Sequence, residues 1–250
     1  MISVSVLGYG NVAYHLVNAF EKASDVNLIQ VYNKTPLLNK DFKASFITDL
    51  SKLKPAQIYI IAIPDDAISS FSKQLASEHA LVVHTSGSLP ISALKSVSRK
   101  GVFYPLQSFS KNKPVIFSEI PFAIEANNSS DLALLKTLAN SLSPLVYEID
   151  SNQRKELHVA AVFVNNFVNY MYTVGKDLCQ SNQIDFNILK PLIKETALKI
   201  EKLSPKEAQT GPAVRFDRQT IENHLNILPS KYKEIYTLLT NSIQKDVKKL

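Results

Sequence analysis

The sequence predicts an α/β domain over residues 1–150, followed by an all-α domain over residues 151–250. Short β-rich runs alternate with helical patterns in the first part, which is typical of a mostly parallel sheet with helices on both faces. A glycine-containing turn joins the first of these runs to the first helical pattern. Beyond Asp150 only helical patterns follow, so we place the domain boundary there.

The first domain is expected to alternate strands and helices. Strands are expected at residues 2–7, 27–32, 44–47, 58–63, 80–84, 101–106, 122–125 and 145–149. Helices are expected at residues 11–22, 67–77 and 132–142. The run 58–63 is unbroken apolar and rich in β-branched residues, as a central parallel strand should be. Asp65 or Asp66 is placed to cap the helix that follows.

The second domain is expected to contain helices only. The first spans residues 151–180 and is apolar on nearly every side. The next spans 185–203, with Asp185 as a cap and a kink at Pro191 unless that proline falls in the first turn. A loop over residues 205–212 leads to two more helices, at 218–228 and 231–248.

The segment 157–174 is apolar enough to raise the question of a membrane span. A spanning helix needs about 20 mostly apolar residues, and this segment carries His158 and three asparagines. We therefore expect a buried helix of a soluble protein that has no membrane partner.

Composition and charge exclude some classes of function. The 250 residues carry a net charge of +6, but the lysines are scattered apart from those in 245–249. Such a pattern indicates a solvated basic surface rather than a nucleic-acid groove, and it would also suit an anionic cofactor. A single cysteine, Cys179, excludes an internal disulfide and fits a cytoplasmic location. No secretory leader is expected, and no spacing typical of metal ligands is present.

The strongest single motif is Gly8-Tyr9-Gly10-Asn11-Val12-Ala13, which follows an expected strand and opens an expected helix. In this context Gly8 permits a tight turn, Gly10 lets the backbone approach a pyrophosphate, and Ala13 lets helix and strand pack closely. The helix N-terminus then offers free N–H groups to the phosphates. The motif predicts a Rossmann dinucleotide-binding domain.

The end of the second strand distinguishes the two nicotinamide cofactors. NAD sites usually carry an acid there, about 20 residues past the glycine loop. This chain has Tyr32-Asn33-Lys34-Thr35 instead. A carboxylate would repel the 2′-phosphate of NADP, whereas the amide of Asn33 and the ammonium of Lys34 can bind it. The sequence favours NADP, although Lys34 could also be an ordinary surface lysine.

Two further loops are expected at the carboxyl ends of parallel strands, where open α/β sheets bind ligands. One contains Ile63 and Pro64, which we expect beside the cofactor. The other contains His84 and Ser86, whose side chains could hydrogen-bond the nicotinamide or the substrate. A turn or helix cap would explain the serine equally well. Tyr104, at the end of another strand, could line the same cleft.

The long helix carries a polar stripe. At about 100° per residue, Asn165 and Asn169 lie close to the direction of His158, and Tyr172 and Lys176 continue the stripe. Buried polar groups need partners, so the stripe indicates a ligand, a partner or a satisfied structural network. On the catalytic reading His158 transfers a proton, Asn165 orients the substrate and Asn169 helps to bind it.

The loop 210–217 contains a Gly-Pro break and an arginine–aspartate pair. Arg215 could bind an anionic substrate through its two-pronged guanidinium. It could equally pair with Asp217 and take part in capping the next helix.

These motifs together resemble one family. They are the phosphate loop, residues 62–65, residues 84–88, His158 with Asn165, and residues 210–224. The chain resembles the Rossmann-like proteins with a C-terminal helical domain of unknown function, usually described as predicted NADP-dependent oxidoreductases. More distantly, it is similar to the group of 6-phosphogluconate dehydrogenase, β-hydroxyacid dehydrogenase and pyrroline-5-carboxylate reductase. The resemblance implies a C-terminal domain like that of 6-phosphogluconate dehydrogenase, an active site between the domains, and a homodimer formed through the helical domain.

The chain departs from these relatives at two positions. The β-hydroxyacid dehydrogenases place a catalytic lysine on the long helix, where this chain's polar stripe begins with His158, so their lysine mechanism does not carry over. The closer family leads us to expect glycine after the arginine of the Gly-Pro loop, but this chain has Phe216.

The sequence thus favours an enzyme that transfers a hydride between NADP and a small carbonyl, imine or hydroxy compound. The cofactor carries the redox chemistry, and the protein positions the reacting atoms. A sensor or scaffold that binds NADP without turnover is the alternative. Reduction of a deazaflavin or another redox carrier is a third reading.

Overall fold

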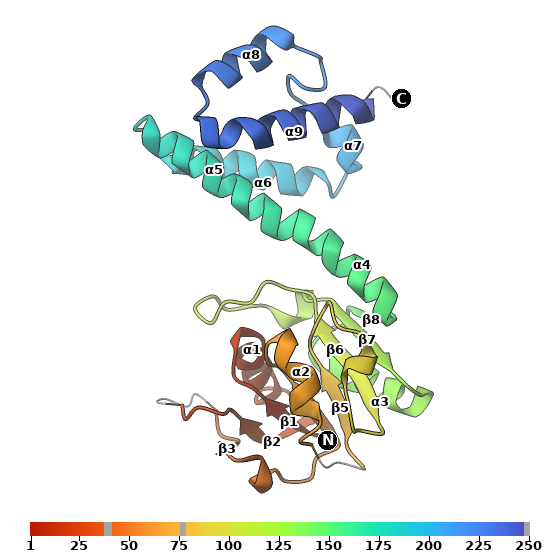
Figure 1. Cartoon of the computed structure of the whole chain (residues 1–250). Coiled ribbons are helices and arrows are strands. Elements are labelled where there is room, and N and C mark those ends of the chain that lie inside the picture. The colour runs from red at the N-terminus through yellow and green to blue at the C-terminus, as the bar shows by residue number, and fades with distance from the viewer. Residues whose placement is uncertain (38–41, 76–78, 248–250) are drawn as a thin grey trace. The chain divides into compact units, whose positions relative to one another are not determined.

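The computed structural model describes residues 1–37, 42–75 and 79–247. The chain divides into two compact units, Met1–Asn165 and Asn166–Leu250. Figure 1 shows the strands in the first unit, whereas the regular elements described in the second are all helical. The change of pattern expected at residue 150 coincides with the start of the long helical run, and the division between the units falls later in that run.

The described strands of the first unit form an eight-stranded sheet in the order β3-β2-β1-β4-β5-β6-β7-β8. Their bounds are β1 (Ile2–Leu7), β2 (Val26–Tyr32), β3 (Ser45–Ile47), β4 (Ile58–Ile61), β5 (Leu81–His84), β6 (Lys100–Pro105), β7 (Phe122–Ala126) and β8 (Val146–Glu148). β6 and β7 pair antiparallel, and the other neighbours pair parallel. The predicted Rossmann sheet is confirmed. Its strand order reverses between β1 and β4, where such sheets bind ligands beyond their carboxyl ends.

Helices cover both faces of the sheet, because the buried strands alternate their side chains between two apolar layers. In β4, Ile58 and Ile60 join the layer beneath α1 (Asn11–Phe20) and α3 (Ser129–Asn140). Tyr59 and Ile61 join the opposite layer beneath α2 (Asp65–Ser72). This alternation explains why the sequence of the strand is apolar without a break.

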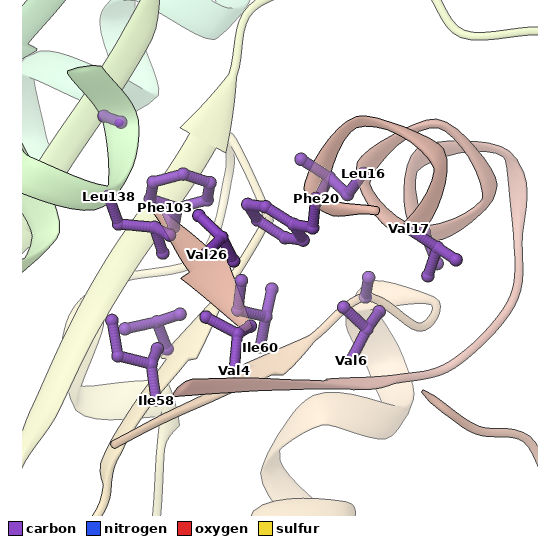
Figure 2. Packing of buried hydrophobic residues seen from close by; sticks show 14 of the residues in the cluster. Val4, Val6, Leu16, Val17, Phe20, Val26, Ile58, Ile60, Phe103 and Leu138 are labelled. Atoms are coloured by element: carbon purple, nitrogen blue, oxygen red, sulfur yellow. The ribbon is translucent and has the colours of Figure 1, made fainter. Parts of the chain in front are cut away.

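Figure 2 shows how α1 packs on the sheet, with Leu16, Val17 and Phe20 turned toward the strands. These three side chains are almost completely buried. Burial of an aliphatic or phenyl side chain stabilises a fold by about 1.5–3 kcal/mol. The packing of α1 therefore fixes the helix that begins directly after the glycine loop.

The start of α2 differs from the prediction. Pro64 is the N-cap, and Asp65 and Asp66 lie in the first turn without a side-chain cap. The expected cap is therefore wrong, because the carboxylate of Asp65 accepts a hydrogen bond from Ser86 instead. The helix ends at Ser72 rather than at residue 77, and positions 76 and 77 lie outside the described residues.

The long helical run consists of α4 (Ser151–Ala161), a π-helical segment (Val162–Phe167) and α5 (Val168–Ser181). Its extent agrees with the prediction, and Asp150 caps its start in a capping box. The π-helical segment changes the rotation per residue, since its hydrogen bonds join residues five apart. The directions of Asn165 and Asn169 relative to His158 therefore differ from those expected from a uniform rotation of about 100°.

The second unit continues with four helices in the described residues. They are α6 (Lys190–Lys199), α7 (Pro205–Ala208), α8 (Arg218–Ile227) and α9 (Ser230–Val247). Asp185 caps a 3-10 turn before α6, and Pro191 falls in the first turn of that helix, where no kink is required. The short α7 replaces part of the expected loop because Ser204 and Glu207 form a capping box. The predicted end of α9 at residue 248 lies outside the described residues.

The apolar run 157–174 is exposed, not buried as the sequence suggested. Val164 is 74% exposed and Tyr170 is 50% exposed. In the described part of the second unit, the buried hydrophobic side chains are those of Cys179, Ala213 and Tyr232. No helix among the described residues is long and apolar enough to cross a membrane. The apolar sequence that indicated a buried helix therefore lies on the surface of the two units as each is described.

Candidate active site

The backbone conformation and packing of the chain require a glycine at position 8, whether or not a ligand is bound. It follows β1 with a φ of +116°, a conformation that side chains other than glycine rarely adopt. A Cβ at this position would lie 2.3 Å from the backbone oxygen of Ala62, just beyond β4. The glycine thus permits both the turn and the close approach of the loops that follow β1 and β4.

Gly10 has a different environment. It is the N-cap of α1, with a φ of −73° that any residue can adopt. A Cβ built on Gly10 meets no heavy atom within 4 Å. Neither backbone conformation nor protein packing explains this glycine. Because the helix N-terminus beside it presents unsatisfied N–H groups, a bound phosphate group would account for the open space.

The glycine loop forms one wall of a cavity of about 350 Å³. Its lining comprises Gly8, Tyr9, Gly10, Asn11, Val12, Asn33, Ala62, Ile63, Pro64, Asp65 and Thr85. Every residue expected to bind the cofactor is present except Lys34. Ala62, Asp65 and Thr85 also line the cavity. They were not named as cofactor residues, although they lie in or beside the loops expected at the ligand-binding edge of the sheet.

The end of β2 supplies no carboxylate to this cavity. Asn33 lines it, and its amide Nδ2 donates to the backbone oxygen of Thr35 at 2.8 Å. That bond fixes the amide and leaves its oxygen as an acceptor. Lys34 is exposed beside Asn33, so its ammonium can reach an anion in solvent.

His84 lies in the sheet core, completely buried at the end of β5. Burial and the positive charge of Arg154 lower its pKa to about 4, opposed by a hydrogen bond to Pro90. Its Nδ1 accepts the backbone N–H of Ser86 at 3.2 Å, and its Nε2 lies 3.3 Å from the backbone oxygen of Pro90. The ring is thus neutral at pH 7 and holds the following loop in place, which favours a structural role over the expected catalytic one.

Ser86 is also tied into this loop. Its hydroxyl donates to the carboxylate of Asp65 at 2.7 Å and accepts the N–H groups of Ser88 and Leu89 at 3.1 and 3.0 Å. These bonds favour the alternative in which the serine stabilises a turn. They also join the loop after β5 to the first turn of α2, on the wall of the cavity beside the glycine loop.

Tyr104 and His158 form a pair of side chains that can each carry a proton. Tyr104 Oη lies 3.1 Å from Nδ1 of His158, so β6 and α4 meet at this bond. In the described residues no second hydrogen bond to the His158 ring is formed, which leaves Nε2 available. The pKa of Tyr104 is raised overall, mainly because the phenol is partly buried. The positive charge of Arg154 acts against this rise, and the negative charge of Asp65 adds to it.

Gly87 lies directly against this pair. A Cβ at Gly87 would lie 2.6 Å from His158 Nδ1 and 2.7 Å from Tyr104 Cζ. The loop after β5 therefore reaches from the cofactor cavity, through Ser86 and Asp65, to Tyr104 and His158. Sequence reasoning placed Tyr104 at the cleft but not among the catalytic residues, because it gave no sign of the bond to His158.

Comparison with known proteins identifies the family of this chain. A family model described as a domain of unknown function, DUF2520, matches residues 120–243. The Bacteroides fragilis protein provisionally named NADP oxidoreductase BF3122 is 41% identical, with 98% of each chain covered and a TM-score of 0.90. The chain belongs to the same family as this protein. A comparison with curated proteins gave no match.

More distant structures share the fold of this family. Protein TM1727 from Thermotoga maritima is 20% identical, with 98% of each chain covered and a TM-score of 0.74. The Plasmodium falciparum pyrroline carboxylate reductase, solved with NADP bound, is 16% identical, with a TM-score of 0.65 over 99% of this chain and 97% of that one.

The remaining expected site residues are exposed. Asn165 lies in the π-helical segment at the end of the first unit, while Asn169 and Arg215 belong to the second. Their contacts with substrate stay predictions. Asp217 caps α8 by accepting the N–H of Thr220 at 3.1 Å.

The family's expected glycine after Arg215 also has a structural explanation. Phe216 has a φ of +53°, which lies in the left-handed region that favours glycine. In this chain a residue that adopts the left-handed conformation less readily than glycine occupies the position.

Proposed function

We propose that the protein is an NADP-dependent oxidoreductase that transfers a hydride to or from a small carbonyl, imine or hydroxy substrate. The observation that carries this proposal is the cavity at the switch point of the sheet. It is lined by the glycine loop, by Asn33 and by the residues after β4 and β5. The provisional name of the Bacteroides fragilis relative supports the same class of reaction.

The residues of the cavity fit NADP. The open space at Gly10 and the free N–H groups of α1 suit the pyrophosphate. Asn33 and Lys34, without an acid between β2 and Pro36, suit a 2′-phosphate. When bound, NADP supplies or accepts the hydride, and the protein positions the reacting atoms and moves the proton.

Tyr104 and His158 perform the proton transfer in this proposal. With Tyr104 Oη donating to Nδ1, the neutral imidazole of His158 carries its hydrogen on Nε2. During reduction, Nε2 donates this proton to the oxygen or nitrogen that gains the negative charge. Nδ1 takes the phenolic proton at the same time, so the imidazole stays neutral. Oxidation of the substrate reverses both transfers.

A cofactor titration tests the first half of the proposal. The purified protein is titrated with NADPH and with NADH while nicotinamide fluorescence is followed. We expect NADPH to bind more tightly, and Lys34→Met to weaken NADPH binding on the order of tenfold, or about 1.4 kcal/mol, while NADH binding stays unchanged. Asn33→Asp should reverse the preference. If neither cofactor binds at millimolar concentration, the proposal is wrong.

A substrate screen tests the second half. The protein is mixed with NADPH and with representative cyclic imines, ketones and aldehydes, and with NADP and hydroxy acids, and absorbance of the reduced nicotinamide is followed. Turnover that needs His158 supports the enzyme. Tight NADPH binding without turnover across all classes favours the sensor or scaffold.

We also propose that the helical unit forms a homodimer, as the family resemblance implied. Large apolar side chains are exposed on several of its helices, and the described residues of this unit bury few others. The exposed apolar side chains include those of Ile188, Leu192, Ile227 and Leu238. Exposed apolar surface of this extent marks an interaction site.

Light scattering after gel filtration tests the dimer and should give twice the mass of one chain. Leu238→Lys should lower the measured mass, whereas Thr237→Lys should leave it unchanged. A monomeric wild type would contradict this.

A further inference from the structure

Arg154 is a completely buried arginine one helical turn before His158. Its guanidinium forms a short ion pair with Glu125 of β7 and donates from Nη2 to the backbone oxygen of Leu89 at 2.6 Å. Ser151 joins the same cluster, because its hydroxyl donates to the Glu125 carboxylate at 2.8 Å and accepts the N–H of Ile91 at 2.9 Å. The cluster therefore holds α4 against β7 and against the loop that contains Gly87.

A structural tether alone does not explain the choice of residue. Burying a charge is costly, and an apolar side chain of similar size often serves as well. Moreover, Nε of Arg154 is buried and has no hydrogen-bond partner among the described residues. The protein thus keeps a buried cation at the base of α4 at some energetic cost, which suggests a role for the charge itself.

The charge of Arg154 acts on two titratable groups of the first unit, Tyr104 and His84. It adds to burial in lowering the pKa of His84, and it opposes burial, which raises the pKa of Tyr104. Asp65, at the start of α2, acts on Tyr104 in the opposite sense. His158 faces Tyr104 from α4 through their hydrogen bond. Of the charged groups around Tyr104, Arg154 is the one that favours the phenolate.

We propose that Arg154 is the positioning residue of the Tyr104–His158 pair: it fixes the turn of α4 that carries His158 and stabilises the phenolate that proton transfer leaves on Tyr104. The inference rests on the proposed function of the pair. Protons balance as follows: the Nε2–H bond of His158 breaks as substrate takes the proton, the Oη–H bond of Tyr104 breaks and an Nδ1–H bond forms. Before the next turnover the Nδ1 proton returns to the phenolate of Tyr104, and solvent supplies one proton to Nε2 of His158.

The test measures the ionisation of Tyr104 without any substrate. The full chain is labelled with 3-fluorotyrosine, which lowers the phenol pKa into a range where folded protein can be titrated. The Tyr104 resonance in the ¹⁹F NMR spectrum is assigned by its loss in Tyr104→Phe. Titrations compare the wild type with Arg154→Met, Arg154→Lys and Glu125→Gln, and circular dichroism confirms that each variant is folded.

The proposal predicts opposite signs for the two partners of the ion pair. Arg154→Met removes the cation and should raise the Tyr104 midpoint by about one pH unit, while Arg154→Lys should leave it nearer the wild type. Glu125→Gln removes the counter-charge and should lower the midpoint. If Arg154→Met does not fold, Glu125→Gln still changes one charge of the ion pair, and Arg154→Lys serves as the variant that keeps both charges.

Unchanged midpoints, or the same sign in Arg154→Met and Glu125→Gln, would reduce Arg154 to a tether and overturn the proposal. A failure of the proposed function is distinguishable from this result. It would appear as lack of NADPH binding or of turnover in the wild type, whereas the ¹⁹F titration reports the charge of Arg154 in either case.

Discussion

Tyr104 Oη and His158 Nδ1 lie 3.1 Å apart, although 54 positions separate them in the chain. Gly87 makes this approach possible, since any side chain there would occupy the space of both rings. Three segments therefore converge inside the first unit: the loop after β5, the end of β6 and the second turn of α4. The same loop reaches the cofactor cavity through Ser86 and Asp65.

Substitution of the pair should separate turnover from cofactor binding. We expect His158→Gln to lower kcat by about 10²–10⁴-fold, the usual contribution of a general acid, and Tyr104→Phe to lower it less, because Nε2 keeps its proton. Neither side chain lines the cofactor cavity, so the Kd for NADPH should stay within about twofold of the wild type, a change of less than 1 kcal/mol. Stopped-flow turnover and fluorescence titration check this, with His79→Gln as a surface control. Equal losses of NADPH affinity would contradict the assignment.

The two glycines of the phosphate loop should respond differently to alanine. Gly10→Ala adds a Cβ in open space at an ordinary φ, so thermal stability should be unchanged or slightly higher, while NADPH affinity falls sharply. Gly8→Ala forces a Cβ against the oxygen of Ala62 at a φ of +116°, which should destabilise the fold by more than about 2 kcal/mol. Urea unfolding and NADPH titration distinguish the two effects. Full NADPH affinity in Gly10→Ala would show that no phosphate lies there.

The sequence predicted the first unit well because its signals are local. Strand β4 is an unbroken apolar run that two helical layers cover. The residue type at each motif position of the glycine loop also has a physical explanation. The Tyr104–His158 bond could not be predicted, because it depends on how β6 and α4 pack. The π-helical segment Val162–Phe167 contains no proline or glycine that would signal a change in the helix. The apolar sequence of the same run indicated burial, but an apolar sequence does not say what covers it.

Acid should destabilise the protein through His84. Burial holds its folded pKa at about 4, below the ordinary 6.5, so the unfolded chain binds the extra proton first. The stabilising contribution is complete above pH 6.5 and is lost as the pH falls toward 4, by up to about 3 kcal/mol. Chemical unfolding of the wild type and of His84→Asn at several pH values measures it. The variant should show a shallower loss than the wild type over this window, and parallel curves would contradict the burial of a neutral imidazole.

Helix α5 ends in a motif that normally contains glycine. The N–H of Ile184 bonds the carbonyl of Cys179 at 2.9 Å, the N–H of Gln183 bonds that of Gln180 at 3.2 Å, and Gln183 has a φ of +57°. This is a Schellman motif with glutamine at the position that glycine favours. Gln183→Gly should therefore raise the free energy of unfolding by about 1 kcal/mol, measured in urea. Gln180→Gly, inside the same helix, should lower it by a similar amount. The two opposite signs separate relief of backbone strain from a general effect of added glycine, and a loss of stability in both variants would exclude the left-handed conformation at Gln183.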